Sequence, residues 1–153
     1  MPTPVEKSPA IERYEPVVKR DNTSSLQGIA LPFATYINAI HNRLHPVFAE
    51  ELAAFNALPQ GPARDGDLIT VLEIVLDPAE GQLVRMGVVK ASGVTAFDVA
   101  ALSAINRSRP FGKAPDVIVS YDGKVYLHWE FHRDPSDACT TRNAFPFLLH
   151  SAP

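Results

Sequence analysis

The sequence predicts an α+β domain in which two helices pack on a three-stranded antiparallel sheet. Three patterns lead to this prediction: an apolar stripe of helical period over 33–58, a β-hairpin pattern over 68–91, and an alternating segment over 124–131. A second helical segment separates the hairpin from the last strand. A chain of 153 residues is long enough to bury one core of this kind.

Composition excludes several classes of protein. The net charge of −3 argues against a nucleic-acid partner, and a single cysteine rules out a disulfide scaffold. No run approaches the roughly 20 apolar residues of a membrane-spanning helix. The stretch from Met1 to Asn22 lacks the apolar centre of a signal peptide.

Residues 1–32 are predicted to be a disordered, proline-containing linker. The segment mixes charged and hydroxyl residues with apolar residues that follow no period, so it buries too little apolar surface to offset its ordering entropy. Its prolines favour extended backbone. Such a segment is either a spacer that tethers a domain or a terminus without a role. The prolines are Pro2, Pro4, Pro9, Pro16 and Pro32.

Residues 33–58 are predicted to be the first helix. Apolar side chains recur at three- and four-residue steps and form one stripe. They are Ile37, Ile40, Leu44, Val47, Phe48, Leu52 and Phe55. Pro46 removes a backbone donor inside this run, so we expect a kink or two short helices meeting there. The residues 59–66 contain two prolines and two glycines and are expected to form a loop.

A β-hairpin is predicted next, with strands over 68–76 and 83–91. Both segments are rich in Val, Ile and Leu. The connection 77–81 has Pro78 suited to the first corner of a type I turn and Gly81 suited to a positive φ.

The second helix is predicted over 95–107. Thr95 is a candidate cap, and Asp98 places a negative charge near the helix start. Pro110 ends the helix. A narrow apolar face is formed by Phe97, Ala101, Leu102 and Ile105.

The last strand is predicted over 124–131, after the tight-turn dipeptide Asp122-Gly123. Every second side chain is apolar and should face the core: Val125, Leu127, Trp129 and Phe131. Residues 134–153 are expected to be an irregular tail that could pack on the domain, with a short strand over 145–149.

The order of elements places the last strand at the edge of the sheet. A right-handed helical crossover brings it beside the first strand, so the sheet order is two-one-three and all neighbours are antiparallel. An exposed edge is a template for an extended peptide. The expected partner-binding residues are therefore Lys124, Val125, Tyr126, Leu127, His128 and Glu130.

Residues 81–115 carry a combined pattern. A glycine turn and a Val-rich strand run from Gly81 to Gly93, a Phe-Asp and Ala-Ala-Leu helix follows at 97–105, and Arg109-Pro-Phe111 and Pro115 form the exit. In these features the chain resembles the C-terminal domain of TonB/TolA-type energy-transducing proteins. The resemblance covers residues 68–133, and 33–133 with the first helix included. The irregular tail has no counterpart in the pattern.

The resemblance implies a TonB C-terminal-like split βαβ fold over 33–133 and a function in the periplasm. It implies an inner-membrane anchor absent from this chain, a proton-channel complex at that anchor, and an outer-membrane transporter whose extended segment adds to the edge strand. A TolA-like or generic periplasmic adaptor without receptor energising is the alternative. An enzyme, a cofactor and a nucleic-acid partner are not expected, and the domain could be a monomer or a strand-exchanged dimer.

Two groups of side chains have metal-compatible spacing. His41 and His45 lie four apart on the first helix, and His128, Glu130 and His132 share one face of the last strand. Neither group has a firm third and fourth ligand nearby, so no metal site is predicted.

Cys139 is the single cysteine, and catalysis by it would need a positioned histidine and an orienting partner. We expect a buried or idle thiol, although it could pair with another chain or with a cysteine outside this sequence. The small basic cluster of Arg107, Arg109 and Lys113 suits a helix C-terminus, or else an acidic partner.

Overall fold

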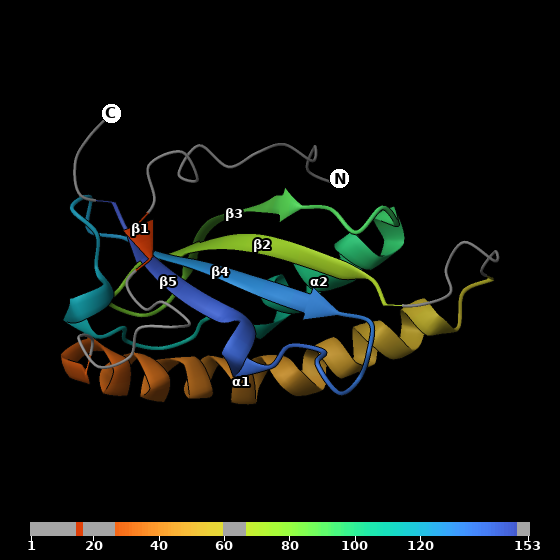
Figure 1. Ribbon diagram of the computed structural model, residues 1–153, viewed down its shortest axis with the longest axis horizontal. Helices are drawn as coiled ribbons and strands as arrows, with labels where there is room; N and C mark the ends of the chain where they lie inside the picture. The colour runs from red at the N-terminus through yellow and green to blue at the C-terminus, as the bar shows by residue number, and fades with distance from the viewer. Residues whose placement is uncertain (1–14, 17–26, 60–66, 150–153) are drawn as a thin grey trace.

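The computed structural model describes residues 15–16, 27–59 and 67–149. A long helix lies along the sheet and a shorter helix packs beside it (Figure 1). The helices are α1 (Gln27–Asn56) and α2 (Thr95–Ser108), and the two 3-10 turns are η4 (Asp116–Ile118) and η5 (Thr141–Asn143). The strands are β1 (Glu15–Pro16), β2 (Ile69–Leu76), β3 (Leu83–Lys90), β4 (Val125–His132) and β5 (Ala144–Leu148).

The sheet has the order β1-β5-β4-β2-β3, and every neighbouring pair is antiparallel. The predicted α+β class and the predicted two-one-three arrangement are confirmed, because β2 lies between β3 and β4. Two further strands continue the sheet beyond β4, so the three-strand count is corrected. The expected strand over 145–149 is β5, and it packs on the domain.

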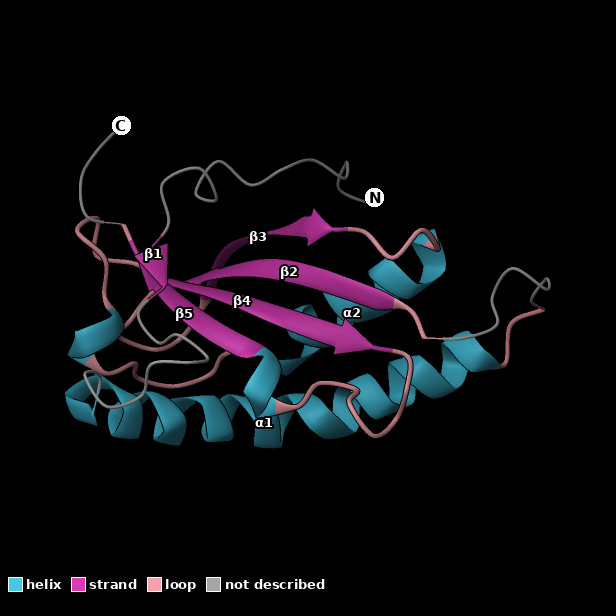
Figure 2. Ribbon diagram, in the orientation of Figure 1, coloured by secondary structure: helices cyan, strands magenta, loops and turns pink. Residues whose placement is uncertain are grey.

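Helix α1 begins earlier than predicted and is continuous. It includes both Pro32 and Pro46, so the chain does not divide into two helices at Pro46 (Figure 2). Pro46 has no amide to donate to the carbonyl of Asn42, one turn earlier. Both residues lie on the exposed side of the helix, where water can donate a hydrogen bond to that carbonyl.

The predicted linker overlaps two regular elements. Gln27–Pro32 belongs to α1, and Glu15–Pro16 forms β1 against β5, so the domain starts before residue 33. The rest of the predicted linker, residues 1–14 and 17–26, lies outside the described residues. Residues 60–66 of the predicted loop over 59–66 and the last four residues of the tail also lie outside the described residues.

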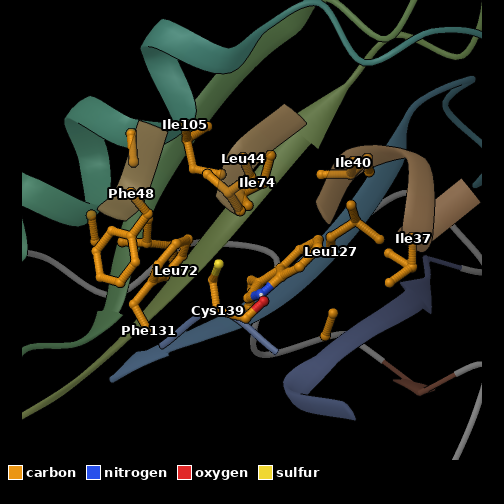
Figure 3. Close-up of a cluster of buried hydrophobic side chains, with 14 of the residues drawn as sticks. Ile37, Ile40, Leu44, Phe48, Leu72, Ile74, Ile105, Leu127, Phe131 and Cys139 are labelled. Atoms are coloured by element: carbon orange, nitrogen blue, oxygen red, sulfur yellow. Dashed lines mark hydrogen bonds between the residues drawn. The ribbon is translucent and has the colours of Figure 1, made fainter. Parts of the chain in front are cut away.

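The core lies between the two helices and one face of the sheet. The rings of Phe48, Phe97 and Phe131 join α1, α2 and β4, with centroids 6.3 Å apart for Phe48–Phe97 and 5.1 Å for Phe48–Phe131. Figure 3 shows this face of the sheet, with Leu72 and Leu127 pointing toward the helical layer. A smaller apolar cluster of Val75, Tyr126, Phe147 and Leu149 stands apart from this core.

The start of α2 is fixed by Ser92 and Asp98. Thr95 is not the cap: the residue before the helix is Val94, with no side-chain cap, and its amide donates to Ser92 Oγ over 3.0 Å. The buried Asp98 carboxylate accepts from Thr70 Oγ1 at 2.6 Å and from the Ser92 amide at 3.0 Å. It therefore ties α2 to strand β2 and to the turn before the helix.

The hairpin turn of β2 and β3 docks against the segment after α2. The amide of Phe111 donates to the Gly81 carbonyl at 3.0 Å, and the amide of Gly112 donates to the Glu80 carbonyl at 2.9 Å. Gly81 has φ +70°, and a Cβ there would lie 2.4 Å from the Gly112 carbonyl oxygen. The glycine of the turn is thus required both by its conformation and by this close backbone contact.

We predict that Gly81→Ala lowers the free energy of unfolding by at least about 2 kcal/mol, because it adds positive-φ strain to a backbone clash. Gly87→Ala is the matched control, since a Cβ at Gly87 meets nothing within 4 Å. Urea unfolding of both variants measures the difference. Equal stability of the two variants would show that the docked turn does not constrain residue 81.

Candidate peptide-binding sheet edge

Strand β4 carries the predicted partner-binding residues, and it lies inside the sheet. It pairs with β2 along its whole length, from Ile69↔His132 to Leu76↔Val125. On its other side it pairs with β5, from Tyr126↔Phe147 to Trp129↔Ala144 (Figure 1). The expectation that Lys124–Phe131 is an edge strand is therefore wrong, because the C-terminal segment folds back and covers it.

The two ends of β4 are covered on that side as well. The Ser120 amide donates to the Lys124 carbonyl at 2.8 Å, and Val119 forms a bridge with Val125. The His132 amide donates to the Ala138 carbonyl at 2.8 Å. An added strand on this side of β4 would therefore replace contacts that the chain already makes.

Of the six predicted residues, Val125 and Leu127 are fully buried in the core. Tyr126 projects from the opposite face, where its ring lies 5.5 Å from that of Phe147. Its hydroxyl donates to Asp122 Oδ2 at 2.6 Å. Burial and this carboxylate raise the pKa of Tyr126 to about 12. Lys124 lies in the turn before β4, where its amide donates to Asp122 Oδ1.

His128 and Glu130 share the face of Tyr126 and contact charged neighbours. His128 Nε2 lies 3.1 Å from Oε1 of Glu73, a carboxylate with no exposed surface, and Arg85 lies 3.4 Å from the other oxygen of Glu73. Glu130 Oε1 lies 3.3 Å from His132 Nε2. The three residues 128, 130 and 132 are thus parts of two ion-pair groups and do not converge on a common point.

His132 contacts two carboxylates. Its Nδ1 lies 2.9 Å from Asp67 Oδ2, in addition to the contact with Glu130. Burial opposes protonation, but the hydrogen bonds to Asp67 and Glu130 outweigh it and raise the pKa of His132. Burial also works against ionisation of Asp67, yet the hydrogen bonds from His132 and from the Asp134 amide lower the pKa of that carboxyl.

The outer edges of the sheet are β3 and the β5–β1 side. Among the described residues, β3 pairs with β2 alone, and its Val84 is 47% exposed. β5 pairs on its outer side with the two residues of β1. A strand could add to β3 without displacing any described element.

A third group of side chains comes together that sequence reasoning missed. Cys139 Sγ lies 3.7 Å from His45 Nδ1 and 4.0 Å from His41 Nδ1, so the histidine pair does have a third potential ligand beside it. The predicted burial of Cys139 is confirmed, and burial raises the pKa of its thiol to about 12. Only the i, i+4 spacing of the histidines was visible in the sequence, because Cys139 is 98 residues from His41.

Two residues of the basic cluster at the C-terminal end of α2, Arg107 and Arg109, make intramolecular contacts. Arg107 bridges Glu50 and Glu51 of α1, with both N···O distances at 2.7 Å, and these hydrogen bonds raise the pKa of Arg107. Arg109 donates to the Asn106 carbonyl at the end of α2. Arg107 therefore ties the two helices together.

The fold is an α+β domain of the split βαβ type. It consists of a hairpin, a helical crossover and a returning strand, and the turn of the hairpin docks on the segment after α2. A family model described as TonB C terminal matches residues 33–127. This match spans more than half of the chain, and the chain belongs to the TonB C-terminal family. Domains of this family are periplasmic, transport-associated and non-enzymatic, and they interact with envelope or outer-membrane proteins.

Searches of curated proteins and of solved structures return no match. No helix in the part of the chain that the structure describes has both the length and the apolar character needed to cross a membrane.

The His132–Asp67 pair predicts a stability contribution that depends on pH. The raised pKa of His132 makes its contribution complete below the unfolded value near 6.5, and the contribution is lost as pH rises through the folded-state pKa. The lowered pKa of Asp67 makes its contribution complete above roughly pH 4, and that contribution is lost on acidification through the folded-state pKa.

The difference in unfolding free energy between the unmodified chain and His132→Asn should therefore be largest between about pH 4 and 6.5. Denaturant unfolding at a series of pH values measures it. Asn42→Ala, an exposed change on α1, is the control whose effect should stay constant with pH. A His132→Asn difference that grew above pH 7 would contradict the assignment.

Proposed function

We propose that this chain is the partner-binding domain of a TonB-like energy transducer. In this proposal it binds an extended segment of an outer-membrane transporter by strand addition and couples the inner-membrane proton-motive force to transport. The observation that carries the proposal is the family match over 33–127, which includes most of α1, all of α2, the hairpin and the start of β4. The inner-membrane proton-channel complex would be reached through an anchor outside this sequence.

Strand β4 is the proposed receiving strand, and β5 is the segment that the partner replaces. The family match ends at Leu127, inside β4, so β5 lies entirely outside the matched part. With β5 and the tail before it removed, the side of β4 from Tyr126 to Glu130 would become the edge on which an extended peptide can add, while Val119 and Ser120 still cover its start.

The geometry of β5 supports its role as a replaceable strand. It has five residues, and its register with β4 covers four residues of that strand, whereas β2 pairs with all eight. Pro146, opposite Leu127, has no amide to donate. A partner strand without proline that pairs with β4 from Tyr126 to His132 would offer it more backbone hydrogen bonds than β5 does.

Release of β5 has a cost that the partner must offset. Phe147 is 1% exposed, and exposing a side chain of this size costs about 1.5–3 kcal/mol. The partner must bring an apolar or aromatic residue of its own to the site opposite Tyr126. The net affinity is therefore modest, as suits a contact that forms and breaks during transport.

A cross-strand disulfide tests the exchange. His128 and Phe145 are paired residues on β4 and β5, and both are partly exposed. In a Cys139→Ser background, His128→Cys with Phe145→Cys should form a disulfide that holds β5 on β4. We predict at least a tenfold loss of affinity for a transporter-derived extended peptide on oxidation, measured from backbone amide shifts at 124–130. The reduced form of the same variant is the matched control.

Binding that is equal in the two redox states, with shifts confined to 83–90, would move the partner to the free edge of β3. An absence of shifts with every transporter peptide would overturn strand addition itself.

The cellular role has its own test. Deletion of the gene should abolish uptake of a transporter's cargo while the outer membrane stays intact, and the full-length gene should restore uptake. A leaky outer membrane with normal uptake would contradict the transducer and indicate the TolA-like adaptor.

A further inference from the structure

His41, His45 and Cys139 form a cluster of metal-ligating side chains at the contact between α1 and the C-terminal segment. One ligand atom of each residue lies within 4.8 Å of the others. The two histidines are one helical turn apart on α1, and their rings are 5.1 Å apart between centroids. Cys139 reaches them from the loop between β4 and β5.

We propose that these three side chains form a binding site for a borderline or soft transition-metal ion, with Zn²⁺ as the best fit. Zinc takes bonds of about 2.3 Å to sulfur and about 2.0 Å to nitrogen, so sulfur and nitrogen ligands of a tetrahedral ion are about 3.5 Å apart. The observed separations are 3.7 and 4.0 Å. Small adjustments of the side chains bring them to this spacing.

The contacts around Cys139 hold the cluster in place. The Cys139 carbonyl oxygen lies 3.0 Å from His41 Nδ1 and accepts from Trp129 Nε1 at 3.3 Å. His41 Nδ1, the ring atom 4.0 Å from Sγ, can bind an ion when the ring proton is on Nε2, and it then exchanges its contact with this carbonyl for the ion. Figure 3 shows Cys139 among the core side chains near Phe131 and Leu127.

The donor set selects the class of ion. One thiolate with two imidazoles suits Zn²⁺ or copper, whereas Ca²⁺ and Mg²⁺ prefer oxygen. Because His45 is exposed, the side of the ion toward solvent keeps a fourth position for water or another ligand. The thiol must lose its proton to bind, and burial holds that proton firmly, so binding releases a proton and strengthens as pH rises.

Titration of the reduced 153-residue chain with Zn²⁺ tests the site. Calorimetry should show one ion per chain, with about one proton released from the thiol for each ion bound. Co²⁺ should bind with the intense near-ultraviolet absorption of a cobalt–thiolate bond. Thermal unfolding should move to higher temperature with Zn²⁺, because the ion binds the folded chain.

His45→Ala and Cys139→Ser should each weaken Zn²⁺ binding at least about 100-fold, because a direct ligand matters no less than an outer-shell partner. His45 is exposed, so its replacement keeps the test valid if Cys139→Ser impairs folding. His132→Asn and Asn42→Ala are the controls, and both should bind as the unmodified chain does.

Two results would overturn the proposal. One is failure of the chain to bind Zn²⁺ or Co²⁺ at neutral pH, which would leave the cluster as a hydrogen-bonded group. The other is binding that persists in both His45→Ala and Cys139→Ser.

Discussion

Burial of the apolar stripe of α1 is the constraint on which the rest of the structure depends. A 30-residue helix cannot be stable alone through two prolines, and it persists here because one face is buried against the sheet and α2. The stripe includes Ile40, Leu44 and Phe48, each at most 1% exposed. Because the helix is fixed in rotation by this stripe, the side chains next to it are fixed too. His41 and His45 follow Ile40 and Leu44 directly, and they face the C-terminal segment for this reason.

The C-terminal segment decides what the sheet can offer a partner. Segments on both sides of β4 belong to the chain itself, with β2 on one side and residues 119–120 and 138–148 on the other. An edge is the feature that makes a sheet a receptor for extended peptides, and proteins commonly protect such edges. Here the cover is short and contains a proline, so it protects β4 from unspecific pairing while remaining weaker than the pairing with β2.

The local elements could be predicted from the sequence because their signals are local. The turn residues Pro78 and Gly81 and the alternation of β4 depend on neighbours in the chain, and the structure has the hairpin and the strand where these signals lie. The helix proline was misjudged because exposure of Pro46 depends on tertiary packing. The edge position of β4 was misjudged for a similar reason. Strand β5, which covers β4, has only five residues and contains Pro146, so its sequence pattern is weak. Its pairing depends on tertiary packing of side chains such as Phe147. The cluster around Cys139 brings together residues 98 positions apart in the chain, and a local spacing pattern cannot predict such a contact.

The cover of β4 and the cluster at Cys139 are parts of one segment, and thermodynamic linkage joins them. Cys139 lies five positions before Ala144, the first residue of β5, and its carbonyl bonds Trp129 of β4. An ion that binds only while Cys139 contacts α1 stabilises the docked segment by RT ln(1 + [ion]/Kd). If release of β5 extends back to Cys139, that same free energy opposes binding of the partner to β4. Reciprocity then requires that the bound partner lowers the affinity for the ion by the same factor by which the bound ion lowers the affinity for the partner. Where release stops at the η5 turn, the two equilibria are independent, so the size of the coupling reports how much of the C-terminal segment moves.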